Sequence, residues 1–431
     1  MKRFGTYKDA LRYLYGLQKY GIKFGLSKTE NLMAAVGNPH RGKAYVHIAG
    51  TNGKGSVAAF LASILKEAGY KVGLYTSPHL VRFTERFKIN GREISRPEVV
   101  ELVNIFQEAI DQKEPPTFFE LTTAMALHYF AEQQTDIAVM EVGMGGRLDA
   151  TNIIEPKVTI ISNIAMEHQF FLGNTLLDIA GEKAGIIKQG VPLVTGAGCR
   201  KVVELFRRIC QEKAAPMIRI GEQVRYRHSR SGLNYYGMWH KWSGMEMGLK
   251  GGFQARNATL ALAAAELLAD SGFAVPERAF RDGVRNASWP GRMQLIGGQP
   301  SILLDGAHNP RAMRTLAGAV EAEFSYNRLI VVIGIMEDKD IKSILKQIVP
   351  MADHVIYTRP EYPRAAKPEG LFALGKIMHR SAQVVERLDN AIVEAREMAG
   401  PSDLILICGS LFTIGEALSC LDPLNYPPEG I

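Results

Sequence analysis

The sequence contains few cysteines and no paired cysteine motif. Its four cysteines, Cys199, Cys210, Cys408 and Cys420, show no C-x-x-C spacing. This pattern supports neither a disulfide framework nor a zinc site built on cysteine. We therefore expect reduced thiols in a cytoplasmic protein.

Long apolar runs are also missing. No segment approaches the ~20 uninterrupted apolar residues that a membrane helix needs, so we expect no membrane partner. The basic N-terminus, MKRFGTYKDALRYLYGLQKYG, lacks the apolar core of a signal peptide. With 46% hydrophobic residues among 431, the chain is long enough for two or three globular domains.

The charge is only mildly biased. Lys and Arg number 51 against 44 Asp and Glu, for a net charge of +7. The densest basic run, RYRHSRSG at residues 225–232, is more typical of a solvated strand and turn than of a nucleic-acid contact. We expect no nucleic-acid partner, whereas a mildly basic surface suits polyanionic small substrates.

Short β-branched runs alternate with longer amphipathic segments, which predicts an α/β fold with mostly parallel sheets. The expected strands are YVHIAG, KVGLYTS, DIAVMEVG and VTIISNI in the first half, and ILLDG, LIVVIGIM, HVIYT and DLILICGS in the last third. The expected helices lie at residues 55–69, 97–111, 117–133, 175–188 and 310–323.

Two further segments define the expected organisation. Residues 217–250 alternate polar and aromatic side chains between turns, which predicts antiparallel hairpins appended to the first sheet. The stretch SWPGRMQLIGGQP, rich in proline and glycine, predicts a linker before a fresh α/β unit. We therefore place a domain boundary at residue 295, with domains over residues 1–295 and 296–431.

The stretch HIAGTNGKGS, residues 47–56, lies between an expected strand and an Ala-rich helix. It is two residues tighter than the standard G-x-x-x-x-G-K-[ST] phosphate loop. Its glycines and the helix N-terminus suit phosphate oxygens, Lys54 would reach the β- and γ-phosphates, and Ser56 offers a hydroxyl. The alternative is an ordinary βα turn with a surface lysine.

Three more expected strands end near side chains of metal-binding type: Ser77, Glu141 and His168. Each of them also fits an ordinary structural role. Ligands of open α/β sheets bind outside the carboxyl ends of the strands, so their shared position beside the phosphate loop predicts a Mg²⁺–nucleotide site. His168 is the weakest of the three, because Mg²⁺ prefers oxygen ligands.

Lys183 lies in the middle of the apolar stripe formed by Leu176, Ile179, Ala180 and Ile187. Burial would lower the pKa of its amine and leave a neutral nucleophile. Such an amine reacts with CO₂ to give a carbamate anion able to orient Mg²⁺. The alternative is a lysine whose stem is buried and whose amine extends to the surface.

The second half supplies a matching set of polar residues, which predicts a cleft lined from both domains. ILLDGAHNP brings Asp305, His308 and Asn309 to one strand end, and LILICGS brings Ser410 to another. Arg256 and Asn257 open the Ala-rich helix, and Arg292 lies in the linker.

Seven motifs, GTNGKGS, TSPHL, EVGMGGRLDATN, EKAGIIK, PGRMQ, LDGAHNP and CGS, occur in this order along nearly the whole chain. Their sequence and order resemble the family of folylpolyglutamate synthase and bifunctional dihydrofolate synthase, within the Mur ligase superfamily. The resemblance implies an ATP-binding central domain of P-loop type over residues 1–295 and a Rossmann-like glutamate-ligase domain over residues 296–431. It implies ATP-dependent joining of L-glutamate to the carboxylate of dihydropteroate or reduced folates, through an acyl phosphate.

The resemblance also implies roles for individual residues. The residues expected to bind ATP are Asn52, Gly53, Lys54, Gly55, Ser56, Asn257, Arg292 and Asp305. Those expected to bind one or two Mg²⁺ ions are Ser77, Glu141 and His168. The catalytic set is Lys54, Lys183, Asp305 and His308, with Lys183 carbamylated by CO₂. The substrate-binding set is Thr117, Phe118, Phe119, Leu148, Asp149 and Ala150 for the pterin, and His308 and Ser410 for glutamate.

The resemblance further implies small-molecule substrates, a monomer, and K⁺ as a candidate ion. The chain has Met166-Glu167-His168 where the family has Leu-Asp-His, so the carboxylate is kept with one more methylene. TSPHLVRFTER and GGRLDATN favour the bifunctional enzyme over a folylpolyglutamate synthase alone. A UDP-muramyl ligase is disfavoured, because the phosphate loop begins near residue 47 and leaves little chain for a UDP-binding domain. A P-loop switch would have no use for Asp305, His308 and Ser410.

Overall fold

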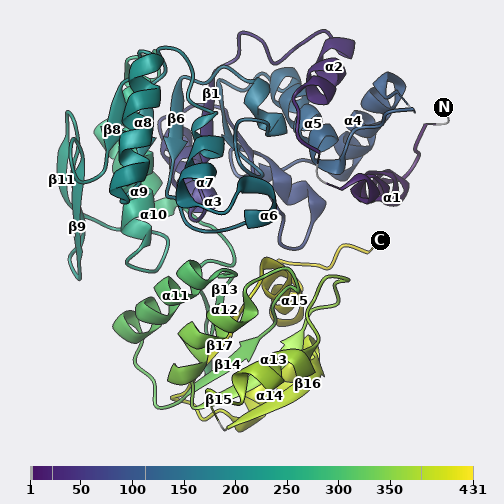
Figure 1. The fold of residues 1–431 in the computed structure, drawn as a ribbon, viewed down its shortest axis with the longest axis vertical. Helices are drawn as coiled ribbons and strands as arrows, with labels where there is room; N and C mark the ends of the chain where they lie inside the picture. Colours follow the sequence, from purple (N-terminus) through teal and green to yellow (C-terminus); the bar gives the residue numbers. More distant parts are fainter. Residues whose placement is uncertain (1–2, 22, 112, 380, 431) are drawn as a thin grey trace.

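The computed structural model describes residues 3–21, 23–111, 113–379 and 381–430, which form two units built on separate sheets (Figure 1). The first sheet has eight strands in the order β4-β3-β2-β5-β1-β6-β7-β8. Its parallel strands are β1 (Tyr45–Ala49), β2 (Val72–Tyr75), β5 (Ile137–Glu141), β6 (Val158–Ile161), β7 (Leu193–Thr195) and β8 (Met217–Arg219). Two antiparallel strands, β3 (Phe87–Ile89) and β4 (Arg92–Glu93), complete one edge.

Helices cover both faces of this sheet, which is why its central strands are buried along their whole length and are mostly apolar. One core is shared by β1, β5 and the helices α3 (Lys54–Glu67), α9 (Gln254–Ala269) and α10 (Glu277–Asn286). A second core lies under α1 (Tyr7–Gly16), α2 (Ser27–Ala35), α4 (Arg96–Ala109) and α5 (Phe118–Glu132). A third lies under α6 (Gln169–Leu172), α7 (Leu176–Ala184) and α8 (Arg200–Glu212).

The hairpins at residues 217–250 differ from the prediction that they extend the first sheet. β8 does join that sheet, but β9 (Arg225–Ser229), β10 (Gly232–Tyr236) and β11 (Lys241–Met245) form an antiparallel sheet of their own. Leu233, Tyr235 and Trp242 on this sheet are buried in the core shared with α9 and α10. The apolar face of the hairpins is therefore covered by helices, and pairing with the first sheet is not needed.

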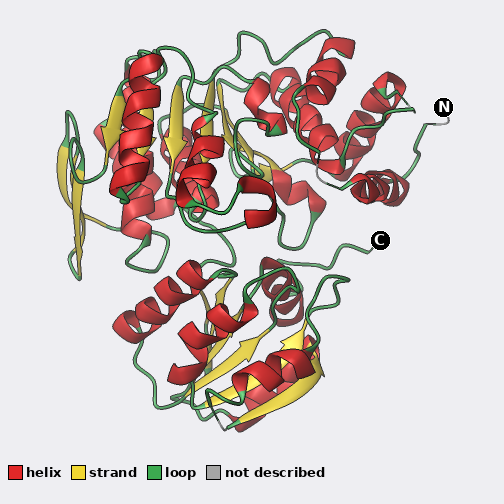
Figure 2. Cartoon of the chain, in the orientation of Figure 1, coloured by secondary structure: helices red, strands yellow, loops and turns green. Residues whose placement is uncertain are grey.

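The second unit contains a six-stranded sheet in the order β12-β13-β17-β14-β15-β16 (Figure 2). β12 (Gln294–Ile296) is antiparallel to β13 (Ser301–Asp305), and the other pairs are parallel. The remaining strands are β14 (Leu329–Ile333), β15 (His354–Arg359), β16 (Ala382–Arg387) and β17 (Leu404–Cys408). Two cores on this sheet lie under α11 (Pro310–Glu323), α12 (Ile341–Ile348) and α13 (Pro368–Gly375), and under α14 (Leu388–Met398) and α15 (Leu411–Leu421).

The α/β class, the mostly parallel sheets and the small antiparallel sheet are confirmed. The expected helix at residues 175–188 is shorter, because α7 ends at Ala184 and Gly185 packs against Arg147. The predicted boundary at residue 295 falls inside β12, which pairs with the second sheet. Short 3₁₀ helices connect other elements, namely η1 (Leu17–Tyr20), η2 (Phe83–Arg86), η3 (Ala150–Ile153) and η4 (Val349–Met351). Within the described ranges, no helix is both long and apolar enough to cross a membrane.

Candidate active site

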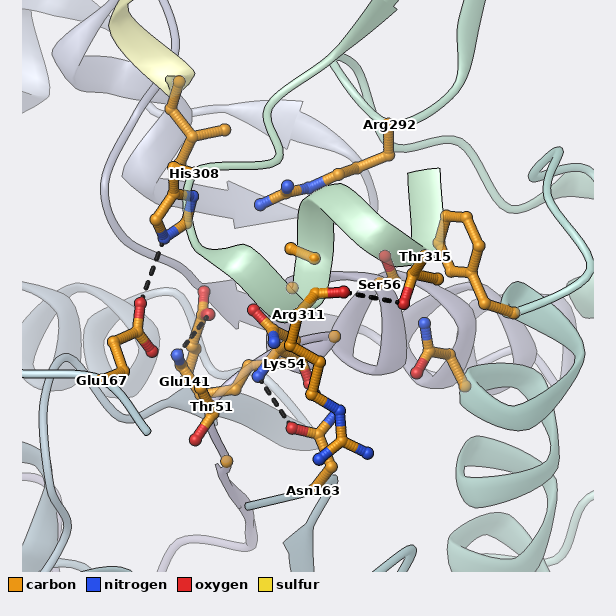
Figure 3. A pocket seen from close by; sticks show the side chains of 18 of the residues that line it. Thr51, Lys54, Ser56, Glu141, Asn163, Glu167, Arg292, His308, Arg311 and Thr315 are labelled. Atoms are coloured by element: carbon orange, nitrogen blue, oxygen red, sulfur yellow. Dashed lines mark hydrogen bonds and ion pairs between the residues drawn. The ribbon is translucent and has the colours of Figure 1, made fainter. Parts of the chain in front are cut away.

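A polar cavity of about 260 Å³ lies between the two units, at the carboxyl ends of β1, β2, β5 and β6 (Figure 3). The first unit contributes the phosphate-loop residues, and the second contributes the start of α11. The predicted residues that line it are Asn52, Gly53, Lys54, Gly55, Ser56, Ser77, Glu141, His168, Lys183, Asn257, Arg292, Asp305 and His308. The fold thus brings together the residues expected to bind ATP and Mg²⁺.

The phosphate loop is held in a fixed shape by its neighbours. Asn163 accepts a hydrogen bond from Asn52 N at 3.1 Å and donates to Asn52 O at 2.9 Å. Gly53 precedes α3 with φ of 85°, and a Cβ there would lie 2.6 Å from Asn257 Oδ1. The loop therefore requires glycine at Gly53 for both conformation and space. The turn opens directly into the N-terminus of α3, where backbone amides and the helix dipole favour an anion.

Glu141 ends β5 inside the cavity and is 5% exposed. Ser77 N donates to its Oε2 at 3.1 Å, and Lys54 Nζ lies 3.9 Å from its Oε1. Burial raises the pKa of the Glu141 carboxyl above its usual value, and Lys54 opposes that shift. A desolvated carboxylate with one nearby cation and a neighbouring serine fits a divalent cation chemically.

His168 lines the same cavity at the start of α6, in a left-handed conformation with φ of 49°. Among the residues that the structure describes, no three His, Cys, Asp or Glu side chains gather into a ready-made metal cluster. The predicted metal set therefore amounts to one carboxylate, one serine and one imidazole on different strand ends.

Lys183 is buried, with 5% exposure, and its side chain lines the cavity from the last turn of α7. The alternative of an amine that extends to the surface is therefore wrong. Burial lowers the pKa of Lys183 to about 7, and the positive charge of Lys54 acts in the same direction. An appreciable fraction of this amine is neutral at physiological pH, which is the form that reacts with CO₂.

Glu167, whose contacts the sequence left undefined, links the two units. Its Oε1 lies 3.2 Å from His308 Nε2 (Figure 3). Asn309 Nδ2 donates to the same oxygen at 3.4 Å. Burial alone would raise the pKa of Glu167, but His308 and the nearby His168 and Lys54 lower it below its usual value. Asn309 also donates to Asn52 Oδ1 at 2.8 Å, which ties the phosphate loop to the start of α11.

Asp305 ends β13 at the same face of the second sheet. It is buried, and its carboxylate accepts hydrogen bonds from Met293 N at 3.0 Å and Ala307 N at 2.9 Å. Burial raises the pKa of Asp305, and Arg292 opposes that shift. The carboxylate therefore organises the turn that presents Arg292 and His308 to the cavity.

A second cavity of about 340 Å³ adjoins the first, and it is mostly apolar. The six residues predicted to bind the pterin all line it: Thr117, Phe118, Phe119, Leu148, Asp149 and Ala150. Both cavities share Ser77, Pro78, Gly143 and Met144, so they meet at this point. A Cβ at Gly143 would lie 2.4 Å from Phe119 Cζ, which shows how closely the junction packs.

Two of these six residues also stabilise local structure. Thr117 is the N-cap of α5 and forms a capping box with Glu120. Asp149 caps η3 and accepts hydrogen bonds from Met144 N at 2.9 Å and Thr151 N at 3.0 Å. The caps fix the starts of the two elements, and Phe118, Phe119 and Ala150 follow directly behind them.

Ser410, like Asn309, is a predicted residue that lines neither cavity. It is 2% exposed and caps α15, accepting a hydrogen bond from Thr413 N at 3.0 Å. Its neighbour Leu411 lines the first cavity instead. Sequence reasoning missed other lining residues: Lys23, Phe24, Arg86 and Arg364 in the second cavity, and Arg311 in the first. Arg86 lies inside the motif TSPHLVRFTER, whereas Arg364 follows β15 in a loop without a recognisable pattern.

Two family models match the chain. Residues 48–265 match the Mur ligase middle domain, and residues 291–411 match the Mur ligase glutamate ligase domain. The dihydrofolate synthase/folylpolyglutamate synthase of Bacillus subtilis is 36% identical, over 96% of this chain and 98% of the relative.

Solved structures agree with these matches. The structure of E. coli FolC in complex with DHPP and ADP is 32% identical and has a TM-score of 0.90, covering 99% of this chain and all of the other. A bifunctional folylpolyglutamate synthase/dihydrofolate synthase with Mn, AMPPNP and L-glutamate bound is 30% identical, with a TM-score of 0.85, covering 97% of this chain and 98% of that one. The chain therefore belongs to the dihydrofolate synthase/folylpolyglutamate synthase family of Mur ligases.

Proposed function

We propose that this protein uses ATP to attach L-glutamate to the carboxylate of dihydropteroate and of reduced folates. The observation that carries this proposal is the junction of the two cavities at Ser77, Pro78, Gly143 and Met144. A flat aromatic acid bound between Phe118 and Ala150 would extend its carboxylate through this junction toward the phosphate loop. The names of the relatives support the same substrates.

In the first half-reaction, a carboxylate oxygen of the acceptor attacks the γ-phosphorus of ATP, the bond from that phosphorus to the ADP oxygen breaks, and an acyl phosphate forms. Phosphoryl transfer depends mainly on positioning and on stabilising charge on the phosphoryl oxygens. Lys54 and the backbone amides of residues 52–56 fill this role. Asn257, Arg292 and Asp305 line the part of the cavity where the rest of ATP would lie.

Ser77, Glu141 and His168 would hold one or two Mg²⁺ ions, and a metal there neutralises charge on the phosphates. Lys183 would carry a carbamate: its neutral amine attacks CO₂, an N–C bond forms, and the nitrogen loses a proton. The resulting anion is suited to orienting the metal from the buried side of the cavity. K⁺ is a further candidate ion.

In the second half-reaction, the amine of L-glutamate attacks the acyl carbon, and phosphate leaves from a tetrahedral intermediate. We assign glutamate to the side of the cavity formed by residues 296–431, beside His308. His308 and Glu167 form the acid–base pair nearest to that side. Ser410 would contribute by holding the turn that presents Leu411. ATP chemistry thus falls to residues 1–295, and the complete site within one chain is compatible with a monomer.

Dihydropteroate and tetrahydrofolate carry pterin rings that differ in reduction state, and their carboxylates lie at different distances from the ring. The motifs TSPHLVRFTER and GGRLDATN each contribute three lining residues to the second cavity, and they favour activity on both acceptors. The test is ADP release by the purified protein with Mg–ATP and L-glutamate, with each acceptor in turn. Turnover with both acceptors is expected. If saturating dihydropteroate yields no ADP, the proposed activity is limited to folylpolyglutamate synthesis. ADP release without glutamate would contradict amide ligation.

A further inference from the structure

Arg86 is a buried cation that has no carboxylate partner among the residues that the structure describes. Its side chain lines the second cavity and is 6% exposed, and its guanidinium carbon lies 5.0 Å from the centre of the Phe118 ring. Within the described part of the chain, its side chain makes one hydrogen bond, from Nε to His79 Nδ1 at 2.8 Å, and no ion pair. The two terminal nitrogens are thus left without an acceptor from the protein.

The contacts behind Arg86 run in a line to the C-terminal segment. His79 Nε2 lies 3.5 Å from the hydroxyl of Tyr15, and that hydroxyl donates to Glu429 Oε2 at 3.2 Å. The ring of Tyr15 stacks on Phe118, with centroids 5.6 Å apart and an interplanar angle of 16°. The line therefore passes directly behind the aromatic wall of the cavity.

Glu429 itself is well anchored. The hydroxyl of Tyr7 donates to its Oε1 at 2.6 Å, and Phe83 N donates to its two oxygens at 3.2 and 3.0 Å. Upstream, Arg82 donates to the carbonyl of Asn425 at 3.2 Å. Figure 1 shows this segment leaving α15 and returning between the two units toward the first one.

The hydrogen bonds in this line have a fixed donor-to-acceptor direction, because the guanidinium of Arg86 stands at one end and the carboxylate of Glu429 at the other. A guanidinium only donates, so His79 Nδ1 carries no proton and accepts from Arg86. The ring proton of His79 then lies on Nε2 and points to Tyr15. A carboxylate only accepts, so the Tyr15 hydroxyl proton points to Glu429. Every donor in the line is thereby directed away from the cavity, except the terminal nitrogens of Arg86.

An unpaired buried cation is costly unless a ligand supplies acceptors. We propose that Arg86 determines specificity for the pteroyl group by donating to its oxygen or nitrogen acceptors, and that Glu429 positions Arg86 through Tyr15 and His79. This inference rests on the proposed function. It gives Arg86 and His79 of the motif TSPHLVRFTER a role in substrate binding. It also makes the C-terminal segment, through Glu429, part of the acceptor site.

The test measures KM for dihydropteroate and for ATP in three variants. Arg86→Lys keeps the charge but loses the planar fork, and we expect KM for dihydropteroate to rise about tenfold, with KM for ATP within about twofold. Tyr15→Phe keeps the stacked ring but removes the hydroxyl, and a rise of about fivefold in the same KM is expected. Tyr70→Phe removes a hydroxyl that donates to the carbonyl of Ala274 at 3.1 Å, outside both cavities and outside the line, and it should leave both KM values unchanged.

A pair of variants at His79 separates positioning from packing. An Asn side chain keeps an acceptor near the place of Nδ1, whereas Leu removes it, so His79→Asn should retain most of the affinity that His79→Leu loses. Equal effects of Tyr15→Phe and Tyr70→Phe, or equal losses in both His79 variants, would overturn the positioning role. Equal rises in KM for ATP and dihydropteroate would overturn the specificity role of Arg86.

A direct binding experiment distinguishes the failure of this inference from the failure of the proposed function. Dihydropteroate is titrated by fluorescence against the wild type and Arg86→Lys, without ATP or glutamate. Weaker binding to the variant supports the role of Arg86, and equal binding contradicts it. The absence of wild-type turnover would instead overturn the proposed function.

Discussion

Glu167 Oε1 and His308 Nε2 lie 3.2 Å apart, although the two residues come from different units of the molecule. His308 Nδ1 is 2.9 Å from the carbonyl of Gly306, so both ring nitrogens face acceptors. Glu167 adjoins His168, and Asn309 contacts both Glu167 and the phosphate loop. One carboxylate thus couples the nucleotide side of the cavity to the side that we assign to glutamate.

Removal of this carboxylate should slow turnover more than it weakens ATP binding. Glu167→Ala breaks the contacts to His308 and Asn309, and a charged hydrogen bond of this kind corresponds to a loss of about 10- to 100-fold in kcat. Glu167→Asp keeps the charge on a side chain one methylene shorter, so it should retain activity within about fivefold. Steady-state kinetics measures both, and equal losses in the two variants would contradict the role of the charge.

Lys183→Ala should abolish turnover and leave ATP binding largely intact, because the amine lies at the buried side of the cavity. Added short carboxylates, such as acetate or propionate, should restore part of the activity by replacing the carbamate anion. The matched control is Lys188→Ala, since Lys188 donates to the carbonyl of Asn152 outside both cavities. ADP release and nucleotide titration provide the readouts. Full activity of Lys183→Ala would contradict the carbamate.

Carbamate formation should depend on pH in a defined direction. Burial, with Lys54 second, lowers the pKa of Lys183 to about 7, so the reactive neutral amine becomes more abundant as the pH rises. Roughly a tenth of the amine is neutral one unit below that pKa and roughly nine tenths one unit above it. Protein stripped of CO₂ at about pH 6 should regain activity faster at about pH 8 when the concentration of dissolved CO₂, which falls as bicarbonate forms, is held equal at both pH values. A ¹³C carbamate signal from labelled bicarbonate follows the modification, and its absence in active enzyme would rule it out.

Gly53→Ala should impair ATP binding. The added Cβ would lie 2.6 Å from Asn257 Oδ1, and φ of 85° disfavours any side chain. Gly69→Ala is a matched control, because Gly69 has φ of 95° and a Cβ added there would meet no atom within 4 Å. Both variants should lose about 1 kcal/mol of folding stability from backbone strain, but only Gly53→Ala should raise the KM for ATP. Thermal melts and ATP titrations separate the two effects. Equal ATP affinities of the two variants would show that Asn257 moves away from the added Cβ without weakening ATP binding.

Much of this site follows from sequence because parallel strands carry their ends to one edge of a sheet. The phosphate loop, Glu141 and His168 can be placed together for this reason. The apolar stripe around Lys183 places the stem of this side chain on a buried face but leaves open whether the amine is buried too, which the structure shows. Periodicity also predicts the helices and the parallel strands, since each buries a repeating apolar face. The same reasoning misplaces the hairpins, because alternation shows that one face is buried without showing what covers it.

The contacts between units cannot be predicted in the same way. Glu167 and His308 are separated by 141 residues, and no local pattern indicates that they meet. Arg364 reaches the second cavity from a loop after β15, where neither periodicity nor turn chemistry distinguishes it from other exposed arginines. The position of Ser410 at a strand end is compatible with a glutamate contact, whereas its hydroxyl caps α15. A polar residue at a strand end can either bind a ligand or cap the following helix, and only the fold shows which of the two it does.

The most direct test of the proposed reaction uses dihydropteroate labelled with ¹⁸O in both carboxylate oxygens. The protein is incubated with an excess of this substrate, Mg–ATP and L-glutamate, and the phosphate released before the product accumulates and accepts a second glutamate is analysed by mass spectrometry. If the carboxylate is activated as an acyl phosphate, one ¹⁸O atom should appear in phosphate for each ADP formed. Unlabelled phosphate accompanying ADP would contradict this route and, with it, the proposed ligase reaction.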